Sequence, residues 1–436
     1  MSRAPDVIAI VGGGWAGIAA AVELAEHLGE RASIHLLEAG RRLGGRARST
    51  NWRDGDFGIL DEGQHMLLGA YRETLALMRR VGVAPETVLR RLPLTIRSWP
   101  RGPQFSNGNL PAPLGLCLGL LRARGIGWRE KYHAARFGKI LMNCRHAPRE
   151  DQGVTEWLAE NGQTGTLRDH FWRPLCLAAL NTPPERASAR LLFNVLHDSL
   201  GSREAGATDL LLPVAPLSQI LPDPAADWLR ARGVHIHLGT RVRQLRATAA
   251  GWQLRHREGE IVSNMVILAV APQHLPALAT HAGLSLPDYQ FEPIGTLYFR
   301  HATRTALPFP LMALAGGMGQ WLVDRGNGIL AASLSGRGAW TTMPKAELAA
   351  ALHREIAPLI GGNAAVLPPC RMFTARRATF SATPGLIRVA ADTPWPTLWI
   401  AGDHTWRAYP ATLEGAVRSG LNAARQVSSR ATSKNP

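Results

Sequence analysis

The sequence contains little cysteine, and its few cysteines are far apart. Four occur in 436 residues, and none forms a C-x-x-C pair: Cys117, Cys144, Cys176 and Cys370. Disulfide frameworks and zinc sites need denser or more regular spacing, so neither is predicted, and no metal site is expected. We expect reduced thiols in an intracellular protein.

Long apolar runs are also missing. Residues 1–6 lead straight into an apolar segment without the features of a secretory signal. No apolar run approaches the roughly 18 residues that a bilayer span requires. These absences predict a cytoplasmic chain, either soluble or attached to the inner face of the cytoplasmic membrane.

Acidic residues are scarce relative to basic ones. The chain has 33 Asp and Glu against 49 Lys and Arg, a formal charge of +16. Such an excess suggests an anionic partner, either nucleic acid or a membrane surface. A nucleic-acid binder would need a known motif or a platform of basic and aromatic residues, and neither is visible. With 46% hydrophobic residues the chain can bury a large core, and its length suits two or three domains.

A glycine-rich loop near the N-terminus carries the strongest motif. Residues 7–11 form a continuous apolar run, typical of a strand buried in a parallel sheet. Gly12, Gly14 and Gly17 then fit G-x-G-x-x-G, and residues 18–25 favour a helix. In this motif the glycines allow a tight turn, close approach of backbone N–H groups to a pyrophosphate, and close helix–strand packing. The order strand, loop, helix therefore predicts a dinucleotide site.

An acidic residue follows at the expected spacing. Residues 33–37 predict a second strand, and Glu38 ends it 38 − 17 = 21 positions after Gly17. An acid about 20 residues after the glycines hydrogen-bonds a ribose hydroxyl.

The next segment indicates which dinucleotide is bound. Residues 39–48, with Gly44, Gly45 and Arg46, resemble the second glycine motif of FAD enzymes in the amine oxidase and phytoene desaturase superfamily. The resemblance implies that this motif runs along the diphosphate and ribityl chain, where an Arg is a charge-assisted clamp. The predicted cofactor is FAD, and the contacts expected from these first segments are Gly12, Gly14, Trp15, Ala16, Gly17, Glu38, Ala39, Gly44, Gly45 and Arg46.

The same resemblance implies an α/β fold whose Rossmann-type FAD domain is split in sequence and joined to a helical and α+β substrate domain. Residues 233–242 and 264–271 read as strands that return to the cofactor, and residues 398–405 form a strand and loop before a helix starting near residue 410. The contacts implied for these later segments and for residues 63–65 are Gly63, Gln64, His65, Val242, Ala271, Gly402, Asp403, Thr412, Leu413, Glu414 and Gly415. The helix start would face the flavin pyrimidine edge, and Asp403 would accept from a ribityl hydroxyl or a backbone amide.

These motifs predict the domain boundaries. The FAD domain is expected in three parts and the substrate domain in two, followed by a disordered tail: 1–66, 230–285 and 391–427; 67–229 and 286–390; and 428–436. The substrate domain should contain helices at 71–81, 128–144, 154–160, 167–180 and 185–200, strands at 293–300, 320–323 and 329–335, and a helix at 345–359.

Longer motifs narrow the family. Residues 60–71, 174–188 and 209–213 resemble hydroxysqualene dehydroxylases, the squalene-associated FAD enzymes of bacterial hopanoid pathways. The resemblance extends from about residue 7 to residue 424. Three positions depart from the pattern: Glu62, where Asn is common, Val214, where Arg is common, and His404, where Trp is common.

This resemblance implies the reaction. Hydroxysqualene would lose its allylic hydroxyl as water, and a hydride from N5 of reduced FAD would replace it, giving squalene. His65 is the first candidate for the proton donor because histidine titrates near neutrality; His404 and Tyr409 are weaker candidates. A His65 that only hydrogen-bonds backbone or cofactor remains an alternative. An unidentified electron donor is required, since no second nucleotide motif is present.

Two other functions stay open. A desaturase or amine oxidase of the same superfamily would reduce FAD rather than oxidise it. A prenyl-lipid carrier would use the fold without catalysis, although the intact glycine motifs and Glu38 argue against it.

One short segment suggests membrane contact. Residues 111–124 are apolar, flanked by bases, and too short to span a bilayer. They predict either a helix lying on an anionic membrane, where a long apolar substrate could enter, or a buried helix of the substrate domain.

Overall fold

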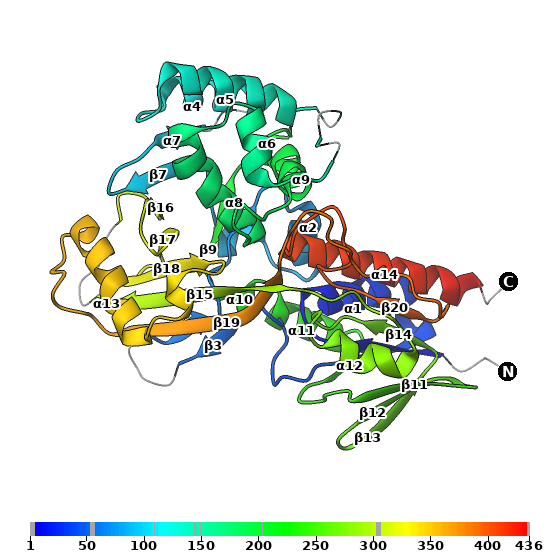
Figure 1. Cartoon of the computed structure of the whole chain (residues 1–436). Coiled ribbons are helices and arrows are strands. Elements are labelled where there is room, and N and C mark those ends of the chain that lie inside the picture. The colour runs from blue at the N-terminus through cyan, green and yellow to red at the C-terminus, as the bar shows by residue number, and fades with distance from the viewer. Residues whose placement is uncertain are drawn as a thin grey trace.

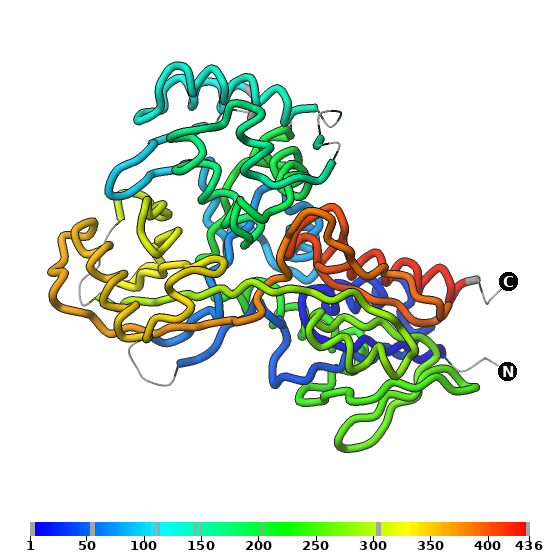
Figure 2. Tube along the Cα trace, in the orientation of Figure 1, coloured from blue at the N-terminus to red at the C-terminus, as the bar shows by residue number. Residues whose placement is uncertain are grey.

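The computed structural model describes residues 5–52, 57–108, 110, 112–143, 145, 147–148, 150–202, 204–301 and 307–433. Figure 1 shows two connected halves: one contains both chain termini, and the other carries a long twisted sheet beneath a group of helices. The chain passes between them several times, as the colours in Figure 2 show.

The first half is built on a five-stranded parallel sheet in the order β10–β2–β1–β14–β20. Its strands come from three distant segments of the chain: β1 (Asp6–Val11) and β2 (Ala32–Leu37), β10 (His235–His237) and β14 (Met265–Leu268), and β20 (Leu398–Ile400). All five strands run in the same direction, so their carboxyl ends share one edge.

Both faces of this sheet are covered. Ile8 and Ile10 of β1 pack into a core that includes α1 (Trp15–Leu28), α11 (Pro222–Arg230) and α14 (Leu413–Ser433). The alternate residues Ala9 and Val11 pack on the opposite side, against α12 (Leu275–Ala279) and an antiparallel sheet of β11 (Gln244–Thr248), β12 (Gly251–His256) and β13 (Gly259–Ser263). Burial on both faces explains why the first strand is apolar throughout.

A seven-stranded mixed sheet forms the base of the other half. Its order is β19–β15–β18–β17–β16–β7–β8. The strands are β7 (Thr95–Trp99), β8 (Gln104–Ser106), β15 (Phe291–Arg300), β16 (Leu311–Leu314), β17 (Trp321–Asp324), β18 (Ile329–Ser335) and β19 (Cys370–Phe380). Helix α13 (Lys345–Ile356) packs on one face, where Phe299 points, and the helices above pack on the other, where Tyr298 points.

Helices form the cap above this sheet (Figure 1). They are α4 (Ala112–Arg122), α5 (Trp128–Leu141), α6 (Val154–Glu160), α7 (Gly165–Leu167), α8 (Arg173–Leu180) and α9 (Ala189–Ser199). Further helices are α2 (Arg72–Arg80), α3 (Pro85–Val88) and α10 (Leu217–Ile220), and further short strands are β3 (Ser49–Asn51), β4 (Ile59–Asp61), β5 (Leu67–Leu68), β6 (Leu89–Leu92) and β9 (Leu210–Pro213). In the described ranges, no helix is both long and apolar enough to cross a bilayer.

Several expected boundaries are wrong. The strand expected at 233–242 is confined to β10, because the chain then turns at Gly239 to bond the loop after β2. The helix expected at 167–180 is present, but it includes a π-helical turn at Arg168–Trp172. The tail expected to be disordered from residue 428 is instead helical to Ser433, because Val427 and Ala431 pack on the core of the first half. Residues 434–436 lie outside the described range.

Candidate functional site

The glycine loop after β1 is fixed by its own backbone. Gly12 has φ +111°, and its N–H donates to the Leu37 carbonyl at 2.7 Å. A Cβ on Gly12 would lie 2.5 Å from the Ala269 carbonyl oxygen, and one on Gly17 would lie 1.9 Å from the Gly12 oxygen. These two positions therefore exclude any side chain, and the loop closes tightly between strand and helix.

The second glycine motif lies directly against the first. The Gly44 N–H donates to the Gly13 carbonyl at 2.8 Å, and a Cβ on Gly45 would lie 3.0 Å from Gly14 Cα. Two segments separated by a helix and a strand thus form one surface, as the sequence motifs together predict.

Gly14 differs from Gly12 and Gly17 because the space that a side chain would occupy is open. In the described part of the chain, a Cβ there would meet only Gly45 Cα, at 3.9 Å. Gly14 is the N-cap of α1, whose first turn has no acidic residue and whose cap makes no side-chain hydrogen bond among described residues. The first N–H groups of α1 can therefore receive an anion such as a phosphate.

Glu38 links the two glycine segments. Its carboxylate accepts from the Gly13 N–H at 2.7 Å and from the Gly40 N–H at 2.6 Å. Each carboxylate oxygen keeps lone-pair capacity for a further donor. The predicted contact with a ribose hydroxyl stays a prediction, and the observed bonds show how the carboxylate is oriented.

Arg46 and Asp403 form an ion pair across 357 residues of sequence. Arg46 Nη2 lies 2.7 Å from Asp403 Oδ2, and Nη1 donates to the Ala378 carbonyl at 2.8 Å. Burial favours the neutral acid, but Arg46 and His404 together outweigh burial and hold the pKa of Asp403 well below its usual range. The sequence predicted separate contacts of both residues with FAD, whereas the structure pairs them with each other.

The ion pair leaves the second oxygen of Asp403 with only a long contact to His404. Asp403 is 3% exposed, and its Oδ1 makes no well-formed hydrogen bond among the described residues, although His404 Nδ1 lies 3.5 Å away. A buried carboxylate oxygen without a donor is rare in a folded protein. A hydroxyl-bearing chain such as the ribityl part of FAD would supply that donor, so this position fits the cofactor.

The C-terminal segment completes the site by backbone geometry. The Gly402 N–H donates to Ser419 Oγ at 2.9 Å, and Thr412 Oγ1 accepts from the Gly415 N–H at 3.0 Å, capping α14. A Cβ on Gly420 would lie 2.1 Å from the Ala16 carbonyl oxygen, so α14 and α1 are in close contact (Figure 1). Leu413 packs against the core of the first half.

Glu414 has a different role from the predicted one. Its buried carboxylate accepts from the Glu73 N–H at 3.1 Å, the Thr74 N–H at 2.9 Å and Thr74 Oγ1 at 2.7 Å, and it pairs with Arg418. The side chain therefore caps the start of α2, and only the Glu414 backbone remains for a cofactor contact. Its spacing in sequence carries no sign of this distant partner.

His65 is close to Arg46 but is not an obvious acid. Burial lowers the pKa of His65, and the Arg46 charge lowers it further. Its Nδ1 lies 3.0 Å from the Gly63 carbonyl, which can only accept, so Nδ1 carries the proton. The neutral ring then presents Nε2 as an acceptor. The neighbouring Gln64 donates its backbone N–H to Thr296 Oγ1 at 3.1 Å.

The middle segments reach the same edge of the sheet. The Gly239 and Thr240 N–H groups donate to the Gly40 and Glu38 carbonyls, each at 2.8 Å. This pairing brings the buried Val242 toward the loop after β2. Ala271 follows β14, whose end lies against Gly12. Because all five parallel strands end here, the edge is the position where such folds bind dinucleotides.

The two weaker proton-donor candidates are placed differently. Tyr409 donates its hydroxyl to Asp198 of α9, and burial followed by that carboxylate raises the Tyr409 pKa far above its usual value. His404 is fully buried, with Nδ1 3.5 Å from Asp403 Oδ1. Of the two other departures, Glu62 pairs with Arg48 at 3.0 Å and Val214 is exposed.

The sequence did not reveal the importance of Arg388. Its Nη1 donates to the Trp406 and Tyr409 carbonyls at 2.7 and 2.5 Å, and it lies 4.6 Å from the Phe380 ring centroid. Burial lowers the Arg388 pKa to about 10. Arg388 thus holds the loop between Asp403 and α14, and an isolated Arg in an aperiodic segment gives no signal of that role.

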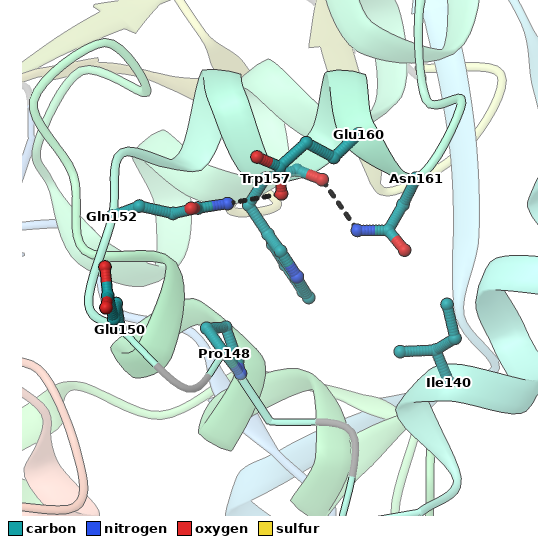
Figure 3. A pocket seen from close by; sticks show the side chains of 7 residues that line it. All are labelled: Ile140, Pro148, Glu150, Gln152, Trp157, Glu160 and Asn161. Carbon is teal, nitrogen blue, oxygen red and sulfur yellow. Dashed lines mark hydrogen bonds between the residues drawn. The ribbon is translucent and has the colours of Figure 1, made fainter.

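A cavity of about 480 Å³ lies in the helical cap, away from all these residues (Figure 3). It is lined by Ile140, Pro148, Glu150, Gln152, Trp157, Glu160 and Asn161. Gln152 Nε2 donates to Glu160 Oε2 at 2.7 Å, and Asn161 Nδ2 donates to the Trp157 carbonyl at 2.8 Å. Two carboxylates make this space unsuited to a long hydrocarbon, and no predicted site residue reaches it.

Comparison with known proteins gives consistent results. The family model for flavin containing amine oxidoreductases matches residues 15–428. Hydroxysqualene dehydroxylases from Rhodopseudomonas palustris and Sinorhizobium fredii are 31% and 28% identical, each over 96% of this chain and 97% and 98% of their own lengths.

Solved structures show the same fold at low identity. An oxidoreductase from Methanosarcina mazei has a TM-score of 0.72 at 12% identity, covering 96% of this chain and 100% of its own. Putrescine oxidase bound to putrescine has a TM-score of 0.68 at 17% identity, covering 98% of this chain and 99% of its own.

The predicted fold class, the FAD cofactor and the resemblance to hydroxysqualene dehydroxylases are thereby confirmed. The chain belongs to the flavin containing amine oxidoreductase family and is an FAD-dependent oxidoreductase.

Proposed function

We propose that the protein catalyses the reductive dehydroxylation of hydroxysqualene to squalene and water. The observation that carries this proposal is the similarity to hydroxysqualene dehydroxylases along nearly the whole chain, including the cap where substrate specificity would reside. An FAD-dependent oxidoreductase is the established part, and the substrate and the direction of the reaction are the proposal.

The chain's own residues would hold and orient the cofactor. The N-terminus of α1 beside Gly14 would receive the diphosphate, Glu38 the ribose, and Asp403 Oδ1 a ribityl hydroxyl. When reduced FAD is bound there, it supplies the hydride that replaces the substrate hydroxyl. The Arg46–Asp403 pair keeps the carboxylate ionised, which makes it a strong acceptor.

His65 is the residue that we propose to contact the departing hydroxyl. In its neutral form Nε2 accepts a hydrogen bond and would orient the hydroxyl, whereas proton donation requires the imidazolium. The lowered pKa favours the neutral form at pH 7. If His65 donates the proton, kcat should rise as the pH falls below about 6.5; if it orients the substrate, kcat should not follow this titration.

The proposed partners follow from the reaction. The substrate would be a long apolar isoprenoid, and a separate electron donor would reduce the FAD, because the sequence contains one dinucleotide motif. Contact with a membrane surface would give the enzyme access to such a substrate.

A desaturase or amine oxidase is the second candidate, supported by 23% identity to a 15-cis-phytoene desaturase from Synechococcus elongatus over 97% of the chain. A carrier is less consistent with the open side of Gly14 and with Asp403 Oδ1, which is buried without a well-formed hydrogen bond.

Product analysis separates these functions. Purified protein is incubated anaerobically with reduced FAD and hydroxysqualene, and in parallel with oxidised FAD and phytoene or amines, followed by mass spectrometry. The proposal predicts squalene from hydroxysqualene alone. A desaturated carotenoid or an oxidised amine would overturn it in favour of the second candidate, and the absence of all products and of bound flavin would favour a carrier.

A further inference from the structure

The outer helices of the cap expose an unusual amount of apolar surface. Fourteen large hydrophobic side chains are exposed in the described part of the chain, and six of them lie between residues 110 and 142: Leu110, Leu114, Leu121, Trp128, Tyr132 and Met142. Helices α4 and α5 pack beside each other at the top of the cap (Figure 1). We call these six residues and the exposed bases of the same segment the α4–α5 face.

Glycines determine which side of α4 faces outward. A Cβ on Gly115 would lie 2.7 Å from the Asn107 carbonyl oxygen, and one on Gly119 would lie 2.4 Å from that of Ser106. The helix therefore lies directly on the strand β8 segment through its glycine side. Leu114, the exposed Cys117 and Leu121 share the opposite side at i, i+3 and i+7.

Helix α5 is oriented by its own buried residues. Phe137 and Leu141 enter the cap core, which leaves Trp128 and Tyr132 outward at i and i+4. The two helices are tied together because Lys131 Nζ donates to the Leu121 carbonyl at 2.7 Å. Their exposed apolar residues consequently form a fixed surface.

This segment has a large excess of positive charge. From residue 112 to 142 the sequence has six bases and one acid, a formal charge of +5. The acid, Glu130, is turned inward and accepts from the Gly127 and Thr166 N–H groups at 3.1 and 2.9 Å. One base, Lys131, is buried, and five bases are exposed around the apolar residues: Arg122, Arg124, Arg129, Arg136 and Lys139.

We propose that the α4–α5 face docks the protein on an anionic lipid bilayer. Trp and Tyr are suited to the membrane interface, Leu side chains enter the acyl boundary, and Arg and Lys bind lipid phosphates while their stems cover apolar surface. Helix α4, with 11 residues, is long enough to lie in the interface and too short to cross it. The partner extends the proposed function, because an isoprenoid alcohol would be held in the same bilayer.

Vesicle flotation of the FAD-loaded protein tests the docking surface. Wild type should float with phosphatidylglycerol–phosphatidylcholine vesicles, and weakly with phosphatidylcholine alone. The Trp128→Gln/Tyr132→Gln variant should lose at least about tenfold in apparent affinity. Ile387 is as exposed as Trp128, at 74%, and Val262 is also exposed, so Ile387→Gln/Val262→Gln is the matched control and should float like wild type.

Charge is tested separately. Arg122→Gln/Arg124→Gln/Arg129→Gln should lose at least about tenfold on anionic vesicles and little on neutral ones. The control, Arg246→Gln/Arg255→Gln/Arg257→Gln, removes the same charge from the β11–β12 region and should retain binding. Equal losses in both triple variants would overturn docking through this face, since net charge would then be responsible.

A probe on Cys117 gives a second readout. With Cys144 and Cys370 replaced by serine, an environment-sensitive dye on Cys117 should shift to the blue when anionic vesicles are added. No shift despite flotation would overturn the proposal, as would a dimer in sedimentation that Trp128→Gln/Tyr132→Gln dissociates without any vesicle binding.

The test is independent of catalysis. Flotation requires no substrate, so a protein that floats through this face but makes no squalene would refute the proposed reaction and leave the docking surface standing. Conversely, Trp128→Gln/Tyr132→Gln should turn over detergent-dispersed hydroxysqualene at the wild-type rate.

Discussion

The dinucleotide edge of the parallel sheet and the α4–α5 face use glycine in opposite ways. At the edge, Gly12 and Gly17 let backbone meet backbone so closely that no side chain fits, and the motif itself defines a ligand site. On α4, Gly115 and Gly119 produce equally close packing, but the consequence is on the far side of the helix, where Leu114 and Leu121 become exposed. Close packing therefore creates a site at one end and an interaction surface at the other.

The two regions also differ in the side chains that they bring together. The sheet edge collects polar atoms, including the Arg46–Asp403 pair and the Glu38 carboxylate, from segments hundreds of residues apart. The cap face collects apolar and basic side chains from one continuous segment. Substitutions at the sheet edge should alter FAD binding or folding. Substitutions on the α4–α5 face should alter only the partition of the protein between solution and the bilayer.

The largest effect is expected for Gly17→Ala. Its Cβ would lie 1.9 Å from the Gly12 oxygen, so the loop must move and the free energy of unfolding should fall by about 3 kcal/mol or more. Gly14→Ala is the contrast: it has space in the folded chain and should keep the melting temperature of the FAD-free protein while weakening FAD binding about tenfold or more. Thermal unfolding and flavin titration check both. Equal destabilisation by the two variants would break the distinction between packing and ligand glycines.

Glu414→Ala should rank second. It leaves the buried Thr74 N–H and hydroxyl and the half-buried Glu73 N–H without their acceptor, which should cost about 3 kcal/mol in chemical denaturation. Glu414→Gln keeps one acceptor oxygen and should cost less. The folded Glu414→Ala variant should still bind FAD. A variant that is as stable as wild type but does not bind FAD would show that the Glu414 side chain contacts the cofactor.

Replacement of Asp403 should have a mixed effect. Asp403→Asn removes the charge that neutralises Arg46 and should lower stability by about 2 kcal/mol, less than for a fully buried pair because Arg46 is a third exposed. FAD affinity should also fall. A double-mutant cycle with Arg46→Gln measures the coupling, and simple additivity would contradict the importance of the pair.

The smallest effect concerns the histidines at the outer edge of the parallel sheet. Burial, followed by the charges of His235 and His237, lowers the His35 pKa to about 4. The unfolded chain binds this proton more readily between pH 6.5 and 4, so stability should fall by about 1 kcal/mol as the pH drops through that window, after allowance for solvent screening. His35→Gln should flatten the decrease in melting temperature, and His27→Gln, an exposed control, should not.

These regions differ in how far sequence alone predicts them. The glycine motifs and Glu38 follow from short segments whose backbone requirements are local, and the split of the FAD domain was implied by the family resemblance. The Arg46–Asp403 pair, the Glu414 cap and Arg388 depend on side chains meeting across the fold, and no spacing rule encodes those contacts. The strand Cys370–Phe380 was missed because its outer residues are exposed and do not alternate with buried ones.

The α4–α5 segment shows the limit most clearly. Its composition allowed either a buried helix or a membrane-facing one, and only the packing of Gly115 and Gly119 shows which residues are exposed. The sequence therefore left both a buried and an exposed helix open, and only the tertiary packing shows that one side of α4 is exposed.

The most direct test of the central claim is the direction of electron flow at the FAD site. Protein with reduced FAD is mixed anaerobically with hydroxysqualene, and the oxidised-flavin absorbance is followed with squalene quantified in the same sample. The account predicts that oxidised flavin and squalene appear in equal amounts, and that Gly14→Ala forms both in proportion to its bound FAD. Flavin that stays reduced in the presence of hydroxysqualene, with no squalene formed, would contradict it.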